Sequence, residues 1–180
     1  MHPSSKENMK RARKIVEDKF GKYESGQTIL DLGGRDIKAG QDRTYRPFWD
    51  DVCGEYFIAD INKGGNVTHL MPEPYKIPLE DNSVDIVVSG QTFEHVHNPF
   101  RAAAELRRVL KPGKFMYIIA PSAGPTHDKP DCWRFYRDSF KAIAQECKIK
   151  VIADWIDNGK EWEDRSARWK DHTFVGQKPA

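Results

Sequence analysis

Short apolar runs alternate along the chain with longer segments in which apolar residues recur at helical spacing. The short runs are rich in β-branched and aromatic residues, which is typical of strands buried on both faces. They predict seven strands, at residues 28–32, 55–60, 67–70, 84–89, 115–120, 149–153 and 173–176.

Three longer segments have the spacing of amphipathic helices. The first follows the capping box Ser4-Ser5-Lys6-Glu7 and ends at Gly21. The second begins at Asn98, places Phe100 on its inward face and ends at 111–113. Asp138 is expected to cap the third, and residues 161–170 favour a short fourth helix. The stretch 35–49 is polar and irregular, so any helix there is short and starts near Pro47.

Strands that alternate with helices predict a mostly parallel sheet covered on both faces. The last two strands are joined without a strong long helix, which fits an antiparallel final strand. We therefore expect an α/β fold in one domain that spans residues 1–180.

Glycine and acidic residues mark the ends of the first two strands. Gly33 and Gly34 follow the first strand, and Asp60 ends the second. Ligands bind beyond the carboxyl ends of strands in open α/β sheets. Glycine lets a ligand approach the backbone closely, and a carboxylate can accept both hydroxyls of a ribose. The pattern indicates a nucleoside-containing ligand.

Composition narrows the class of protein. The 180 residues carry a formal net charge of +2, too small to favour nucleic acid as a partner. Cys53, Cys132 and Cys147 are far apart and form neither a disulfide framework nor a zinc pattern. No run approaches the roughly 18 apolar residues of a membrane span, and residues 1–10 lack a signal-peptide core. We expect a cytoplasmic protein without membrane or nucleic-acid partners.

Four segments resemble class I S-adenosylmethionine-dependent methyltransferases. They are residues 29–33, 57–60, 77–87, and Phe93-Glu94-His95-Val96 together with 108–113. The run IPLEDNSVDIVVSGQTFEHVHNP, at 77–99, matches the family pattern closely. Residues 121–135 resemble a subgroup of small methyltransferases often found with glycan-biosynthesis genes.

The resemblance implies a Rossmann-like three-layer sandwich with strand order 3-2-1-4-5-7-6 and an antiparallel seventh strand. It implies S-adenosylmethionine as cofactor and S-adenosylhomocysteine as product. Asp60 would hold the ribose and Glu73 the adenine amino group, while the backbone at Ser89 would hold the methionine ammonium. The full set of implied cofactor residues is Asp31, Gly33, Gly34, Arg35, Asp60, Ile61, Glu73, Ser89 and Gln91.

One departure from the family pattern is the sequence Gly33-Gly34-Arg35 in place of Gly-x-Gly. A guanidinium matches a carboxylate geometrically. We therefore hypothesise that Arg35 or Arg46 pairs with the cofactor carboxylate.

Methyl transfer to a hydroxyl needs the nucleophile, the methyl group and the sulfur held in line, and it needs a base that accepts the hydroxyl proton. His127 and His95 are the candidate bases, because histidine titrates near neutral pH; His95 could instead orient its helix. For Glu94, capping or pairing is the safer interpretation. Arg134 could bind an anionic acceptor or pair with Asp131 or Asp138, and Trp133 could stack on a sugar or pack in the core. No acidic cluster has divalent-ligand spacing, so no metal is expected.

These residues favour O-methylation of a small molecule or of a sugar or glycan precursor. A non-catalytic cofactor-binding module is the main alternative. A nucleic-acid methyltransferase is disfavoured, because Ser89-Gly90-Gln91-Thr92 replaces the usual Asn/Asp-Pro-Pro-aromatic run. An NAD dehydrogenase is also disfavoured, because the sequence lacks the Gly-x-Gly-x-x-Gly motif that binds the dinucleotide. Trp155, Trp162 and Trp169 could cover the sheet edge or form a homodimer contact.

Overall fold

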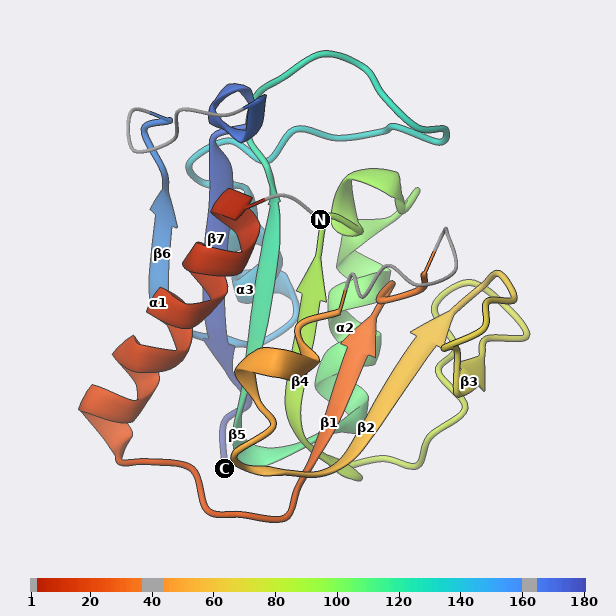
Figure 1. Cartoon of the computed structure of the whole chain (residues 1–180), viewed down its shortest axis with the longest axis vertical. Coiled ribbons are helices and arrows are strands. Elements are labelled where there is room, and N and C mark those ends of the chain that lie inside the picture. Colours follow the sequence, from red (N-terminus) through yellow and green to blue (C-terminus); the bar gives the residue numbers. More distant parts are fainter. Residues whose placement is uncertain (1–2, 37–43, 160–164) are drawn as a thin grey trace.

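A seven-stranded sheet organises the chain in the order β3-β2-β1-β4-β5-β7-β6 (Figure 1). The computed structural model describes residues 3–36, 44–159 and 165–180. Strands β1 to β5 pair in parallel, and β7 runs antiparallel to both β5 and β6. This confirms the predicted strand order. The strands are β1 (Gln27–Leu32), β2 (Cys53–Asp60), β3 (His69–Leu70), β4 (Val84–Gly90), β5 (Leu110–Pro121), β6 (Lys150–Ile156) and β7 (Asp171–Gln177).

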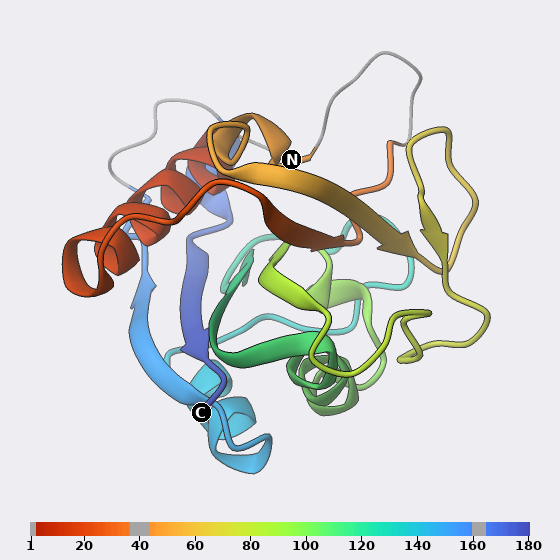
Figure 2. The same ribbon diagram turned by 90° about the horizontal axis from the view of Figure 1, so that it is seen from below.

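Helices cover both faces of the sheet, as Figure 2 shows from below. Helix α1 (Pro3–Phe20) and the 3-10 turn η1 (Arg46–Phe48) lie on one face, and α2 (Pro99–Val109) and α3 (Ser139–Glu146) lie on the other. Two further 3-10 turns are η2 (Phe93–His95) and η3 (Arg165–Arg168). No helix in the described ranges is both long and apolar enough to cross a bilayer.

In residues 44–52 of the connection from β1 to β2, the described segment nearest β2, aromatic side chains fill the core. Tyr45 and Trp49 flank η1 and are fully buried beside Met9 and Val16 of α1. Two large aromatic rings thus replace part of the apolar surface that a crossover helix would bury. The short helical turn expected near Pro47 is confirmed by η1, while residues 37–43 lie outside the described residues.

Tertiary contacts override several local signals at helix ends. The Ser4–Glu7 capping box is wrong: α1 begins at Pro3, and the Ser4 hydroxyl donates to Asp171 at 2.8 Å. Asn98 is a true N-cap, since its side chain accepts from the amide of Arg101 at 3.0 Å. Asp138 occupies the N-cap position of α3 without a side-chain capping bond.

The second helix also differs in extent and orientation. It ends at Val109, and β5 starts at the next residue, so residues 111–113 belong to a strand that begins earlier than predicted. Phe100 is 42% exposed, because Ala103 and Leu106 form the face that packs on the sheet. The inward placement of Phe100 was therefore wrong. The third strand is only two residues long, and residues 160–164 of the expected fourth helix lie outside the described residues.

We expect Phe140→Ala to lower the free energy of unfolding by about 3–5 kcal/mol, because it opens a cavity in the core. Phe140 is fully buried and stacks on Phe135, with ring centroids 4.7 Å apart. Phe100→Ala is the matched control and should cost under about 1 kcal/mol. Urea denaturation of both variants measures the difference. Equal losses would contradict the core assignment.

Candidate functional site

A cavity of about 460 Å³ lies beyond the carboxyl ends of β1, β2 and β4. Gly33, Asp60 and Gln91 line it from the three strand ends. The loop after β5 arches over this edge of the sheet (Figure 1) and adds His127 to the lining. The cavity lies where the strand order changes direction. From β1 the chain continues to β2 on one side of the sheet, and from β4 it continues to β5 on the other side.

The loop after β1, beside the cavity, requires glycine at two positions. Gly33 has φ +80°, and a Cβ there would lie 2.1 Å from the Thr92 hydroxyl oxygen. A Cβ at Gly34 would lie 2.6 Å from the Asp31 carboxylate. The loop after β1 thus packs directly against the loop after β4 and against its own strand, which leaves room only for glycine.

Asp60 and Arg35 face one another on the cavity wall. Arg35 Nε lies 3.5 Å from Asp60 Oδ2, and Asp60 Oδ1 accepts from the amide of Asn62 at 2.7 Å. Arg46, the other guanidinium considered for the cofactor carboxylate, is exposed beside Asp50 and is not among the lining residues. Of the two, the structure brings Arg35 to the cavity.

The remaining cofactor predictions divide into two groups. Ile61 lines the cavity with Gly33, Arg35, Asp60 and Gln91, whereas four residues do not line it. These four are Asp31, Gly34, Glu73 and Ser89. Asp31 accepts a hydrogen bond from the Tyr56 hydroxyl at 2.7 Å, and Gly34 packs on Asp31. Ser89 donates to the Leu32 carbonyl at 3.0 Å, and Glu73 pairs with Lys76 at 3.5 Å. Their cofactor roles stay predictions.

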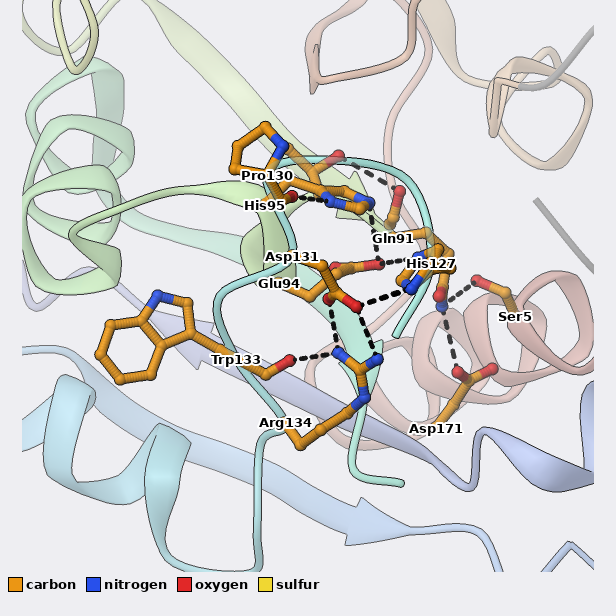
Figure 3. A network of polar contacts seen from close by, with 12 residues as sticks. Ser5, Gln91, Glu94, His95, His127, Pro130, Asp131, Trp133, Arg134 and Asp171 are labelled. Carbon is orange, nitrogen blue, oxygen red and sulfur yellow. Dashed lines mark hydrogen bonds and ion pairs between the residues drawn. The ribbon is translucent and has the colours of Figure 1, made fainter. Parts of the chain in front are cut away.

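Glu94, His95 and His127 form a cluster beside the cavity (Figure 3). Glu94 Oε1 lies 3.7 Å from Nε2 of His95 and 4.0 Å from Nε2 of His127. The two imidazole centroids are 4.9 Å apart. Both candidate bases therefore lie together, one on the turn after β4 and the other on the loop after β5.

A chain of charged contacts orients His127. Asp131 accepts from the His127 amide at 2.9 Å and lies 3.2 Å from His127 Nδ1. Arg134 donates twice to Asp131, at 2.6 and 2.9 Å, which holds the pKa of that carboxyl well below its usual range. Burial lowers the pKa of His127. The imidazole is therefore neutral at pH 7, with Nδ1–H toward Asp131 and the Nε2 lone pair toward Glu94.

Glu94 is fully buried, and neither carboxylate oxygen has a hydrogen-bond partner in the described part of the chain. Burial raises its pKa to about 8. The sequence favours capping or pairing for Glu94; in the structure its Oε1 lies within 4.0 Å of a nitrogen of each imidazole. One oxygen of Glu94 and one nitrogen of each histidine lie within 4.8 Å of one another and could hold a metal ion.

The two predicted substrate residues point elsewhere. The Arg134 guanidinium is engaged by Asp131 and by the carbonyls of Gly124 and Pro125. Trp133 points away from the cluster in Figure 3 and donates to the Val96 carbonyl at 2.7 Å. Neither is among the cavity-lining residues, and their contact with an acceptor stays a prediction.

Sequence reasoning missed an apolar wall of the cavity. Met71, Tyr75 and Ile77 are among its lining residues, and Trp169 packs on His127 with ring centroids 4.8 Å apart. The cluster of prolines around Tyr75 suggested only irregular structure. The positive φ of Tyr75, +66°, sets the ring position and left no signal in the residue pattern. Trp155 bonds Asn8 within the chain, and a homodimer stays a prediction.

The family model and the relatives that the chain resembles are all described as methyltransferases. A family model described as a methyltransferase domain matches residues 55–118. An uncharacterised methyltransferase of Mycobacteroides abscessus is 46% identical over 96 residues, covering 49% of this chain and 37% of that protein. A ubiquinone/menaquinone biosynthesis C-methyltransferase of Coxiella burnetii is 29% identical over 129 residues, covering 62% and 50%. The chain thus matches half or less of the length of these two curated relatives.

The fold has close counterparts among solved structures. A S-adenosylmethionine-dependent methyltransferase from Aquifex aeolicus superposes with a TM-score of 0.62 at 22% identity, covering 98% of each chain. Identity at this level supports a shared fold rather than a shared substrate.

We expect Glu94→Gln to make stability less dependent on pH. Between the ordinary pKa of 4.5 and the native value of about 8, the unfolded chain has released the Glu94 proton while the folded chain retains it. Wild-type stability should therefore fall, relative to Glu94→Gln, as pH rises from about 5 to 8. Urea denaturation of chelator-treated samples measures this. A pH-independent difference would show that Glu94 ionises normally in the folded protein.

Proposed function

We propose that the chain is a class I S-adenosylmethionine-dependent methyltransferase, as the methyltransferase-domain match, the curated relatives and the shared fold support, and that it methylates an oxygen of a small molecule or glycan precursor. The cofactor would bind in the cavity beyond β1, β2 and β4. The observation that supports this most strongly is that Gly33, Asp60 and the oriented imidazole of His127 line one and the same cavity.

The cofactor half of the cavity has chemistry suited to a nucleoside. Asp60 is the acceptor for the ribose hydroxyls, and Met71, Tyr75 and Ile77 offer an apolar surface to the adenine ring. Arg35 would then leave Asp60 to pair with the methionine carboxylate. The 3.5 Å separation between Arg35 and Asp60 is long for an ion pair, so exchanging one partner for another costs little.

The reacting half positions a proton acceptor. When bound, S-adenosylmethionine would supply a sulfonium methyl group that an acceptor oxygen can displace in line, with S-adenosylhomocysteine as the leaving group. The hydroxyl proton passes to His127 Nε2. Asp131 stabilises the imidazolium that results, and Arg134 keeps Asp131 ionised. His95 lies beside His127 and contributes a second acceptor of hydrogen bonds.

C-methylation is a second candidate, supported by the similarity to the Coxiella burnetii C-methyltransferase. There the nucleophile would be a ring carbon activated by loss of a phenolic proton to His127. The chemical shift of a ¹³C-labelled methyl group in the product distinguishes a carbon-bound from an oxygen-bound methyl.

We expect Asp60→Asn to weaken S-adenosylmethionine binding by about 10-fold or more, because it removes a charge-assisted acceptor for the ribose. Asp50→Asn is the control: Asp50 is exposed beside Arg46 and should leave affinity unchanged. Calorimetric titration with S-adenosylmethionine, and with NAD as a negative control, measures both. Equal affinities for the two variants would remove Asp60 from the cofactor site.

We expect His127→Gln to reduce methyl transfer by about 10²- to 10⁴-fold, the usual contribution of a positioned base, with cofactor affinity unchanged. His69→Gln, on β3, is the matched control. The assay follows the labelled methyl group from S-adenosylmethionine into a panel of sugar and phenolic hydroxyls. Full activity of His127→Gln would exclude His127 as the base. Cofactor binding without transfer to any acceptor would favour the non-catalytic alternative.

A further inference from the structure

We propose that Glu94, His95 and His127 bind a divalent transition-metal ion, such as Mn²⁺, Co²⁺ or Zn²⁺. The ligands are one carboxylate oxygen and the Nε2 atoms of the two imidazoles. The open coordination positions of the ion would face the cavity.

The first support is the geometry of the donor atoms. The three lie within 4.8 Å of one another, and Glu94 Oε1 lies 3.7 and 4.0 Å from the two nitrogens. Bonds of about 2.1 Å to a common ion would place donor atoms about 3–3.5 Å apart. The two Glu94 distances need to contract by about 0.2–1 Å, and the histidine nitrogens, which lie within 4.8 Å of each other, by up to about 1–2 Å to surround an ion.

The second support is the orientation of both imidazoles. His95 Nδ1 lies 2.6 Å from the Pro130 carbonyl, which can only accept, so Nδ1 carries the proton. His127 Nδ1 donates in the same way to Asp131. Each ring is thus fixed in the tautomer that presents an Nε2 lone pair toward Glu94. Carbonyls and carboxylates hold metal-binding histidines in this manner.

The third support is the isolation of Glu94. Its side chain is fully buried, and both oxygens lack a hydrogen-bond partner among the described residues. The nearby guanidinium of Arg134 is occupied by Asp131. Leaving a buried carboxyl group without a partner is costly. An ion at the cluster would displace the Glu94 proton and give one oxygen a partner.

The donor set selects the kind of ion. Two imidazoles and one carboxylate suit Zn²⁺, Fe²⁺, Mn²⁺ or Co²⁺ better than Mg²⁺ or Ca²⁺, which prefer oxygen ligands. Three protein ligands leave positions open, as in catalytic rather than structural sites. His95 and His127 line the cavity, so an oxygen atom in the cavity could complete the coordination.

The consequence for the reaction depends on the proposed function. If the acceptor hydroxyl coordinates the ion, its pKa falls, and it can release its proton to water before attacking the methyl group. The ion would then take over the task assigned above to His127, because it occupies the Nε2 lone pair. His127→Gln would still abolish transfer, but through loss of the ion.

Metal titration of the full chain tests the proposal without cofactor or acceptor. Protein freed of metal by a chelator is titrated with Co²⁺, followed by its visible absorption, and with Zn²⁺, followed by calorimetry. We expect one tight equivalent in the wild type. Glu94→Gln and His127→Gln should each weaken binding more than about 100-fold, and Asp131→Asn about 10- to 100-fold as an outer-shell partner.

His97→Gln is the matched control, since His97 lines the same cavity outside the cluster. It should bind like the wild type. Absence of a tight equivalent, or equal binding by Glu94→Gln and wild type, would overturn the proposal; circular dichroism confirms that each variant is folded.

Titration of the same samples with S-adenosylmethionine separates the metal site from the proposed methyltransferase function. Metal binding without cofactor binding rejects the proposed function alone, and the reverse result rejects the metal site alone.

Discussion

The close packing of the loops after β1 and β4 is the constraint on which the site depends. Gly33 lies so near Thr92 that no side chain fits between them, and the Thr92 hydroxyl donates to the Leu32 carbonyl at 3.3 Å. This contact fixes the distance between the two strand ends. It also fixes where η2, and with it Glu94 and His95, leaves the sheet. The positions of the cavity and of the polar cluster therefore depend on one close backbone approach.

A buried polar network supports these loops from behind. Ser5 shares a hydrogen bond of 2.6 Å with Tyr45, and Gln91 donates to Asp171 at 3.0 Å. The network ties α1, the β1–β2 connection, the end of β4 and the start of β7 together at one point. Burial raises the pKa of Asp171 to about 7. Such groups are tolerated when they are hydrogen-bonded, and here they hold together four segments that are distant in the chain.

Much of the fold follows from the sequence, and the reasons are local. Buried strands are short apolar runs, and Gly33, Asp60, His95 and His127 meet because parallel strands end at the same edge. The strand order itself came from the family resemblance. The start of α1 did not follow from the pattern, because Asp171, far along the chain, takes the hydroxyl that a capping box would use. Tertiary partners override local preference in this way.

The polar cluster was only half predictable. Both histidines were identified because they follow strands whose ends line the cavity. The state of Glu94 was not, because it depends on the partner of Arg134: the sequence allowed an anionic acceptor, Asp131 or Asp138, and Arg134 pairs with Asp131. Residue types near one another in sequence do not reveal which partner a guanidinium takes. The isolation of Glu94 thus emerges only from the folded structure, and it changes the interpretation of the two histidines.

We propose that one cavity joins a cofactor site to the Glu94–His95–His127 cluster. A crystal structure of the chain with S-adenosylhomocysteine tests this directly. We expect its ribose at Asp60, its adenine against Met71 and Tyr75, and its sulfur facing His127 across an open space for the acceptor. S-adenosylhomocysteine bound elsewhere, or with its sulfur directed away from the histidines, would show that the cofactor site and the cluster are separate.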